Sequence, residues 1–252
     1  MPYKFATQQL DYSDLASGRV LYSLPSHPAF PIRLASEIFQ RCVARRAATS
    51  DALRHTVFDP CCGSAYHLST LAYGHWPAIQ EIVCSDINPQ AVQLATRNLA
   101  LLTPEGLDQR IQELTEKYHA YGNESFQVAL KSAAALRAQV LSLATQQPIR
   151  TRVFQASAFD VEVLVSQLGD TCVDVVLTDV PYGQRSQWQI DSLDPTQSPI
   201  GAMLNALQSV LHARSIVAIV ADKQQKVTHA GYERVERFQM GKRQVVLLKP
   251  QP

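Results

Sequence analysis

The turn FDPCCGSAY, at residues 58–66, combines residue types that can bind a small zwitterionic ligand. Asp59 follows an apolar run and can accept hydrogen bonds from a cationic amino group. After Pro60, Gly63 permits close approach of a ligand to the backbone, and Ser64 opens a helix whose N-terminus suits a carboxylate. The turn therefore predicts an amino-acid-binding site at the crevice of an α/β sheet. An ordinary strand–helix turn has a similar composition, so this segment alone does not decide.

A second acid, Asp86 in VCSDINP, follows the next apolar run. A carboxylate there can accept both ribose hydroxyls of a nucleoside, and the neighbouring Ile87 can cover an adenine ring. Asp160 is expected either to approach the adenine or to cap a helix over 160–168. Since S-adenosylmethionine joins an amino acid to a nucleoside, Asp59 and Asp86 together predict this cofactor.

The segment LTDVPYG, at residues 177–183, is typical of a loop that binds the amino group of a base. It matches the D/N-P-P-Y/F pattern of amino-methyltransferases, with Val180 in place of the first proline. Asp179 and a backbone carbonyl near Val180 can accept the two hydrogens of an exocyclic amine, whose lone pair is otherwise delocalised into the ring. Pro181 stiffens the turn, and Tyr182 offers a ring on which an extruded base can stack. Catalysis then consists mainly of in-line positioning.

Further candidates lie around these two segments. Arg185 can contact phosphate and Trp188 can stack on a neighbouring base, although both can equally be ordinary loop residues. Cys61 and Cys62 are interpreted as small buried side chains, because a nucleophilic cysteine is expected close to the base. The seven histidines, His67 among them, show no metal-ligand spacing, and no CxxC pair is present, so we predict no metal site and assign these histidines no role.

Apolar runs alternate with helical patterns along most of the chain, which predicts an α/β fold with a doubly wound, mainly parallel sheet. The runs are rich in valine and isoleucine, as expected of strands buried on both faces. Asn88-Pro89 and Ser198-Pro199 each place a capping side chain before a proline at the first helical position. Residues 232–241 and 243–250 predict an antiparallel hairpin at the end of the sheet. The expected parallel strands are 55–60, 81–86, 151–156, 173–180 and 215–222.

Two segments interrupt this alternation. Residues 1–54 predict an N-terminal extension with a helix at 31–47, which leaves 55–252 as the catalytic domain. Within that domain, apolar residues at three- and four-residue spacing between about 104 and 148 predict a helical hairpin insertion. Its acidic and basic residues nearly balance, so we interpret the hairpin as a packing element rather than a substrate-docking element.

Composition excludes several classes of protein. The 252 residues are 46% hydrophobic, enough for a core, but they contain no long apolar run for a membrane span and no secretory signal, so we expect a cytoplasmic protein. The net charge of +1 is unevenly distributed: residues 1–54 carry +3, residues 213–252 carry +5 and the middle carries −7. A basic flank can place a polyanion on one face, and scattered surface charge is the alternative.

These residues together are similar to class I S-adenosylmethionine-dependent methyltransferases and, more narrowly, to the AviRa family of avilamycin-resistance 23S rRNA methyltransferases. The similarity covers most of the chain, in PAFPIRLASEIFQR, FDPCCGSAY, SDINP, NLALLTPEGL and VVLTDVPYGQR. It implies a Rossmann-like sheet closed by an antiparallel hairpin, S-adenosyl-L-methionine as cofactor, and methylation of a guanine in 23S rRNA near the peptidyl-transferase region. It also implies orthosomycin resistance, with 23S rRNA or the large ribosomal subunit as partner of a monomeric enzyme. By the same resemblance, the family's cofactor and catalytic residues fall on Asp59, Gly63, Ser64, Asp86, Asp179, Pro181 and Tyr182.

One departure and two alternatives remain. Ala65 stands where the family pattern has a second glycine, and its methyl group is expected to crowd the methionine moiety of the cofactor. The D-x-P-Y loop also serves enzymes that methylate adenine in DNA or RNA, or a protein glutamine. Ala65 and Val180 further leave open a non-catalytic RNA-binding or assembly protein.

Overall fold

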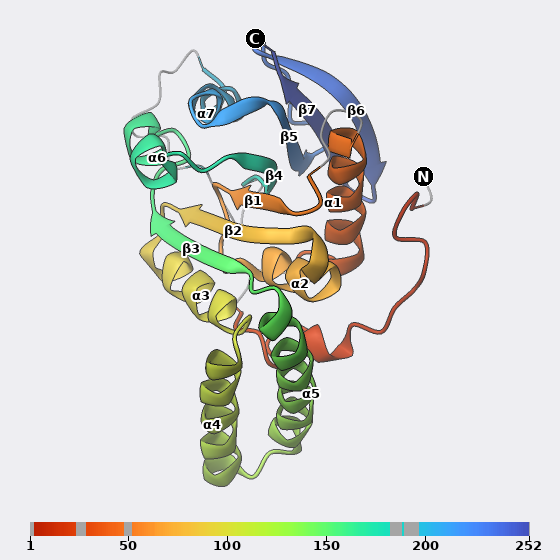
Figure 1. The fold of residues 1–252 in the computed structure, drawn as a ribbon, viewed down its shortest axis with the longest axis vertical. Coiled ribbons are helices and arrows are strands. Elements are labelled where there is room, and N and C mark those ends of the chain that lie inside the picture. Colours follow the sequence, from red (N-terminus) through yellow and green to blue (C-terminus); the bar gives the residue numbers. More distant parts are fainter. Residues whose placement is uncertain (1–2, 24–28, 48–51, 182–187, 189–196, 252) are drawn as a thin grey trace.

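The computed structural model describes residues 3–23, 29–47, 52–181, 188 and 197–251, and its strands form one seven-stranded sheet (Figure 1). The strands are β1 (His55–Asp59), β2 (Ile79–Asp86), β3 (Arg150–Gln155), β4 (Val173–Asp179), β5 (Leu211–Asp222), β6 (Tyr232–Met240) and β7 (Arg243–Pro250). Their order is β3-β2-β1-β4-β5-β7-β6. The first five are parallel, and β7 is antiparallel to both neighbours. The predicted α/β fold with a C-terminal antiparallel hairpin is confirmed.

Helices cover both faces of this sheet, and a helical hairpin projects away from it. The helices are α1 (Ile32–Ala47), α2 (Tyr66–His75), α3 (Pro89–Ala100), α4 (Pro104–Tyr121), α5 (Glu124–Gln146), α6 (Val161–Leu168) and α7 (Pro199–Gln208), with short 3-10 turns at Ser13–Leu15 and Trp76–Ala78. One hydrophobic cluster contains α1, α2 and α3, and a second contains α6 and α7. The hairpin of α4 and α5 extends away from the sheet (Figure 1). Among the helices described, none has both the length and the apolar character to cross a membrane.

The capping residues act as predicted. The side chain of Asn88 accepts a hydrogen bond from the backbone N–H of Gln90 at the start of α3, and Ser198 does the same for Gly201 in α7. The insertion turns at Gly122, whose left-handed conformation ends α4. The helical extension and the hairpin insertion are thus part of the confirmed fold.

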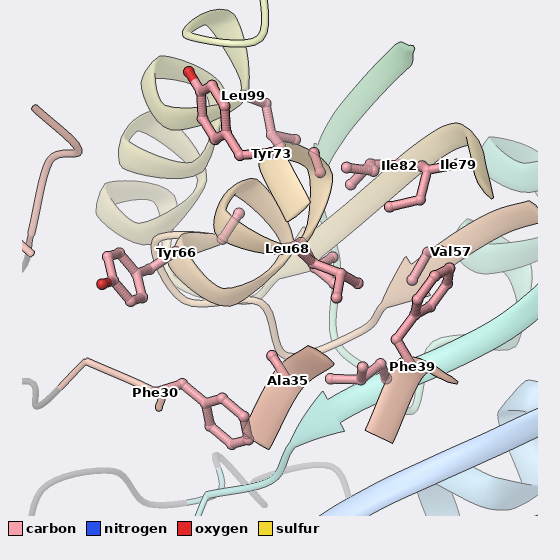
Figure 2. Packing of buried hydrophobic residues seen from close by; sticks show 14 of the residues in the cluster. Phe30, Ala35, Phe39, Val57, Tyr66, Leu68, Tyr73, Ile79, Ile82 and Leu99 are labelled. Carbon is pink, nitrogen blue, oxygen red and sulfur yellow. The ribbon is translucent and has the colours of Figure 1, made fainter. Parts of the chain in front are cut away.

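The core under α2 fixes the strands that carry the candidate site. Figure 2 shows Leu68 of α2 with Val57 of β1, Ile82 of β2 and Phe39 of α1 in the same cluster, and each of these side chains is at most 1% exposed. The helix predicted at 31–47 therefore packs in the same core as the sheet. The division of the chain into an extension and a catalytic domain stays a prediction.

One expectation about the strands is wrong. The run that forms β3 was expected to be buried on both faces, yet Phe154 is the one buried residue in the strand. The reason is its position: β3 is an edge strand that pairs with β2 alone. Arg150 and Arg152 of β3 form ion pairs with Glu81 of β2 at the partly solvated edge.

Asn98 of α3 ties the N-terminal segment to the turn after β1. Its Oδ1 accepts a hydrogen bond from the N–H of Tyr22 (2.7 Å), and its Nδ2 donates to the carbonyls of Tyr22 (2.9 Å) and Ser64 (2.8 Å). Asn98 is fully buried. Since buried polar groups without partners are costly, this amide fixes two distant segments at once.

We expect Asn98→Ala to lower the free energy of unfolding by about 3 kcal/mol, roughly 1 kcal/mol for each lost hydrogen bond. Urea denaturation measures this. Asn88→Ala, which removes only a helix cap, is the matched control and should cost about 1 kcal/mol. If Asn98→Ala lowers the free energy of unfolding by no more than Asn88→Ala does, the hydrogen bonds assigned to Asn98 do not stabilise the fold as described.

Candidate functional site

The two turns expected to bind one ligand are in direct contact. Oδ2 of Asp86 accepts a hydrogen bond from the backbone N–H of Gly63 (2.8 Å), and Oδ1 accepts one from Asn88 (2.9 Å). Burial raises the pKa of Asp86, the N–H groups of Asn88 and Gly63 lower it, and the charge of Asp59 raises it, with a net increase. Beside Asp86, the side chain of Ile87 is 37% exposed, as a surface that covers a ligand must be.

The backbone conformation of the turn shows why a glycine fits at position 63 and what the departure from the family pattern, Ala65, costs. Gly63 has φ +54°, and a methyl group built there meets no atom within 4 Å, so the turn has open space at this point. Ala65 also has a positive φ of +52°, which costs a residue with a Cβ about 1–2 kcal/mol. Ala65 is fully buried in the core around α2. Backbone strain, rather than crowding of a ligand, is the consequence that the geometry shows.

Asp59 has a structural function that the sequence did not predict. Its side chain is fully buried, its Oδ1 accepts a hydrogen bond from the N–H of Cys61 (2.9 Å), and its Oδ2 lies 3.0 Å from Nε2 of His67. Both carboxylate oxygens thus have protein partners. Asp59 fixes the turn to α2, and the adjoining Pro60 is buried as well.

His67 is a residue of the candidate site that sequence reasoning missed. The charges around it are Asp59 at the end of β1 and Asp179 at the end of β4, and the ring of Phe30 lies 5.5 Å away. Burial lowers the pKa of His67, but the hydrogen bond and charge of Asp59 and the charge of Asp179 raise it above its usual value overall. A histidine in the first turn of the helix after a strand-end acid was the available signal.

The adjoining cysteines are neutral thiols. Burial raises the pKa of Cys61 and of Cys62 well above the usual value, and the nearby carboxylates of Asp59 and Asp86 raise it further. Because the thiolate is the nucleophilic form, neither residue is an activated nucleophile. Cys62 is buried as predicted, whereas Cys61 is only partly buried.

The predicted catalytic loop begins where β4 ends. Asp179 is the last residue of β4, and the N–H of the buried Val180 donates to the carbonyl of Val220 (3.0 Å), which extends the pairing with β5. The carbonyl of Pro181 accepts a hydrogen bond from Nε2 of Gln225 (3.3 Å). The following segment starts from a fixed point on the sheet. Two predicted site residues, Tyr182 and Arg185, lie outside the described residues.

Trp188 packs against the connection between β3 and α6. Its ring stacks on Phe159, with the ring centres 5.3 Å apart. The neighbouring Asp160 caps α6 by accepting a hydrogen bond from Val163 (3.0 Å), which is one of its two expected roles. Within the described ranges no cluster of three metal-ligating side chains occurs, and the predicted lack of a metal site stays a prediction.

Comparison with known proteins decides the family. The family model described as rRNA methyltransferase AviRa matches residues 1–243. The chain belongs to the AviRa family of rRNA methyltransferases. A curated relative from Streptomyces viridochromogenes, the 23S rRNA (guanine(2535)-N(1))-methyltransferase, is 39% identical over 247 residues, which are 98% of this chain and 95% of the relative. The chain is therefore an enzyme of this family.

Solved structures agree with this assignment. The rRNA methyltransferase aviRa of S. viridochromogenes superposes with a TM-score of 0.85 at 37% identity, over 99% of this chain and 96% of that one. TrmN from Thermus thermophilus matches at a TM-score of 0.51 and 14% identity, over 90% of this chain and 51% of its own, which shows a shared fold only. The AviRa fold thus extends over the N-terminal segment and the hairpin insertion.

We expect His67→Gln to destabilise the protein by about 3 kcal/mol, and more at about pH 6 than at about pH 9. Because the pKa of His67 is raised in the folded state, its ion pair stabilises fully below the unfolded value of 6.5, and the stabilisation disappears as pH rises through the folded pKa. Urea denaturation at several pH values measures the difference between the two proteins.

His75 of the same helix is the matched control. Burial lowers the pKa of His75. The stability that His75 contributes is therefore lost as pH falls, and the destabilisation caused by His75→Gln should grow with rising pH. If the effect of His67→Gln stays constant or grows with pH, the assigned ion pair is wrong.

Proposed function

We propose that this protein transfers a methyl group from S-adenosyl-L-methionine to the N1 atom of a guanine in 23S rRNA. The observation that carries the proposal is the nearly full-length match to a relative named for this reaction. Two local features support it: the Asp86–Gly63 contact beside open space, and the acidic end of β4 at the same edge of the sheet. The relative's name also selects guanine over the adenine and glutamine alternatives.

The cofactor suits the residues at this edge. We propose that Asp86 accepts hydrogen bonds from the ribose hydroxyls, since a carboxylate has about four acceptor sites and two are in use. Ile87 covers the adenine, and Asp160 lies near its edge. The open space at Gly63 and the N-terminus of α2 receive the amino-acid part, with Ser64 beside it and Pro60 and Asp59 holding the turn. Bound S-adenosylmethionine supplies an electrophilic methyl group.

The acceptor atom determines what Asp179 must do. N1 of guanine carries a hydrogen and has no available lone pair until that proton leaves, so a base is required rather than only a hydrogen-bond acceptor. We propose that the Asp179 carboxylate takes this proton as the nitrogen–carbon bond forms, and later releases it to water. The charge of Asp179 acts on the nearby His67 and contributes to the raised pKa of that histidine. Pro181 orients the loop, and Tyr182 stacks on the extruded base.

The remaining roles follow from the resemblance. We propose that Arg185 and Trp188 contact RNA, with Trp188 keeping one ring face on Phe159. The substrate is 23S rRNA or the large ribosomal subunit, the enzyme acts as a monomer in the cytoplasm, and methylation confers orthosomycin resistance. Expression in a sensitive bacterium should raise the inhibitory concentration of avilamycin.

We expect Asp179→Asn to lower the methylation rate of 23S rRNA by at least about 100-fold, because the variant cannot accept the N1 proton. The measurement is transfer of label from radiolabelled S-adenosylmethionine to ribosomal RNA, ribosomal subunits, genomic DNA and total protein. Asp170→Asn, at an exposed acid, should retain full activity. Label in DNA or protein would reject the substrate, and undiminished transfer by Asp179→Asn would reject the base.

We expect Asp86→Ala to raise the Kd for S-adenosylmethionine about 10- to 100-fold, the range for loss of hydrogen bonds to a charged group. Calorimetric titration measures it, again with Asp170→Asn as control. Unchanged affinity in Asp86→Ala would show that the ribose is bound elsewhere.

A further inference from the structure

The basic residues of the two flanks of the chain differ in whether they form ion pairs within the fold. Arginines of the N-terminal flank are used inside the fold: Arg41 and Arg45 pair with Glu236, and Arg46 pairs with Asp174. Their charges are neutralised by partners on other elements. These three arginines therefore have partners inside the fold for their charges.

Lysines of the C-terminal flank instead gather at the edge that carries the candidate site. Lys223 and Lys226 follow the end of β5, and Lys242 precedes the start of β7. The antiparallel register pairs Asp222 of β5 with Arg243 of β7, so the two turns lie side by side. This edge is the one at which β1, β2 and β4 end, because β5 runs parallel to them.

The turn after β5 also contacts the catalytic loop. Gln225 donates a hydrogen bond to the carbonyl of Pro181 (3.3 Å) and accepts one from the N–H of Asp222 (3.1 Å). The buried Gln244 of β7 donates to the carbonyls of Asp222 (2.8 Å) and Gln225 (2.5 Å). Lys223 and Lys226 therefore lie on a turn that hydrogen bonds hold between the sheet and the start of the predicted catalytic loop.

The charge of this surface remains available to a partner. Lys223, Lys226 and Lys242 are all exposed, and within the described part of the chain none of them forms an ion pair. The acid on the turn, Asp222, uses its Oδ1 to accept a hydrogen bond from the N–H of Gln224 (2.9 Å). Exposed ammonium groups without internal partners suit a phosphate backbone.

We propose that Lys223, Lys226 and Lys242 form an RNA-backbone contact that flanks the catalytic loop and sets the position of the target nucleotide relative to Asp179. This inference rests on the proposed function and adds the surface that holds the substrate. Contacts to phosphate fix orientation without reading sequence.

The test compares Lys223→Ala/Lys226→Ala/Lys242→Ala with the wild type for binding of 23S rRNA by filter retention across a series of salt concentrations. Each phosphate contact contributes about 0.7–0.9 to the slope of log affinity against log salt, so we expect the slope to fall by about 2–3. We expect KM for RNA to rise about tenfold or more, with an unchanged Kd for S-adenosylmethionine.

The control is Lys117→Ala/Lys131→Ala on the hairpin insertion, where both lysines are exposed. It should leave RNA binding and its salt slope within twofold of the wild type. Equal losses in both variants would show a general charge effect and overturn the proposal, as would an unchanged slope in the triple variant. A wild type that neither binds nor methylates rRNA would overturn the proposed function as well, whereas a fully active wild type with an unaffected triple variant overturns only this surface.

Discussion

A buried ion pair between Asp59 and His67 is the interaction on which the candidate site depends. When His67 is protonated, two charged groups are removed from water, which is costly unless further hydrogen bonds satisfy them. The N–H of Cys61 provides one such hydrogen bond to Asp59. Leu177 and Asp179 are two residues apart in β4 and point to the same face of the sheet. Because Leu177 packs in the α1–α2 cluster, Asp179 faces the helix layer that holds His67. The pair thus connects β1, α2 and the carboxyl end of β4.

The supports of this site come from distant parts of the chain. The N–H of Gly63 donates a hydrogen bond to the side chain of Asp86. The carbonyl of the next residue, Ser64, accepts one from the side chain of Asn98, which also binds Tyr22 of the N-terminal segment. On the other side, Gln225 holds the start of the catalytic loop. The N-terminal segment and the last strands are therefore structural parts of the site, in agreement with the family match along nearly the whole chain.

Sequence patterns predicted the elements well because they are encoded locally. Valine-rich runs predicted the strands, and proline at helix starts predicted α3 and α7. Apolar residues at three- and four-residue spacing predicted the hairpin insertion. The strands in turn predicted the edge of the sheet to which Asp86 and Asp179 belong. Three features depend on tertiary contacts. His67 lies in the first turn of the helix after Asp59, but its contact with that acid forms only when the turn folds. The exposure of β3 follows from its edge position, and the lysine surface requires the pairing of β5 with β7. The left-handed φ of Ala65 contradicts the preference of its own residue type.

We propose that methylation of N1 of guanine in 23S rRNA takes place at the carboxyl edge of this sheet. The most direct test is nucleoside analysis by liquid chromatography and mass spectrometry of 23S rRNA that has been incubated with the enzyme and S-adenosylmethionine. We expect 1-methylguanosine as the new nucleoside, absent from reactions with Asp179→Asn. Methylation of an exocyclic amine, as N2-methylguanosine or N6-methyladenosine, would contradict the role assigned to Asp179 as the base that removes the N1 proton.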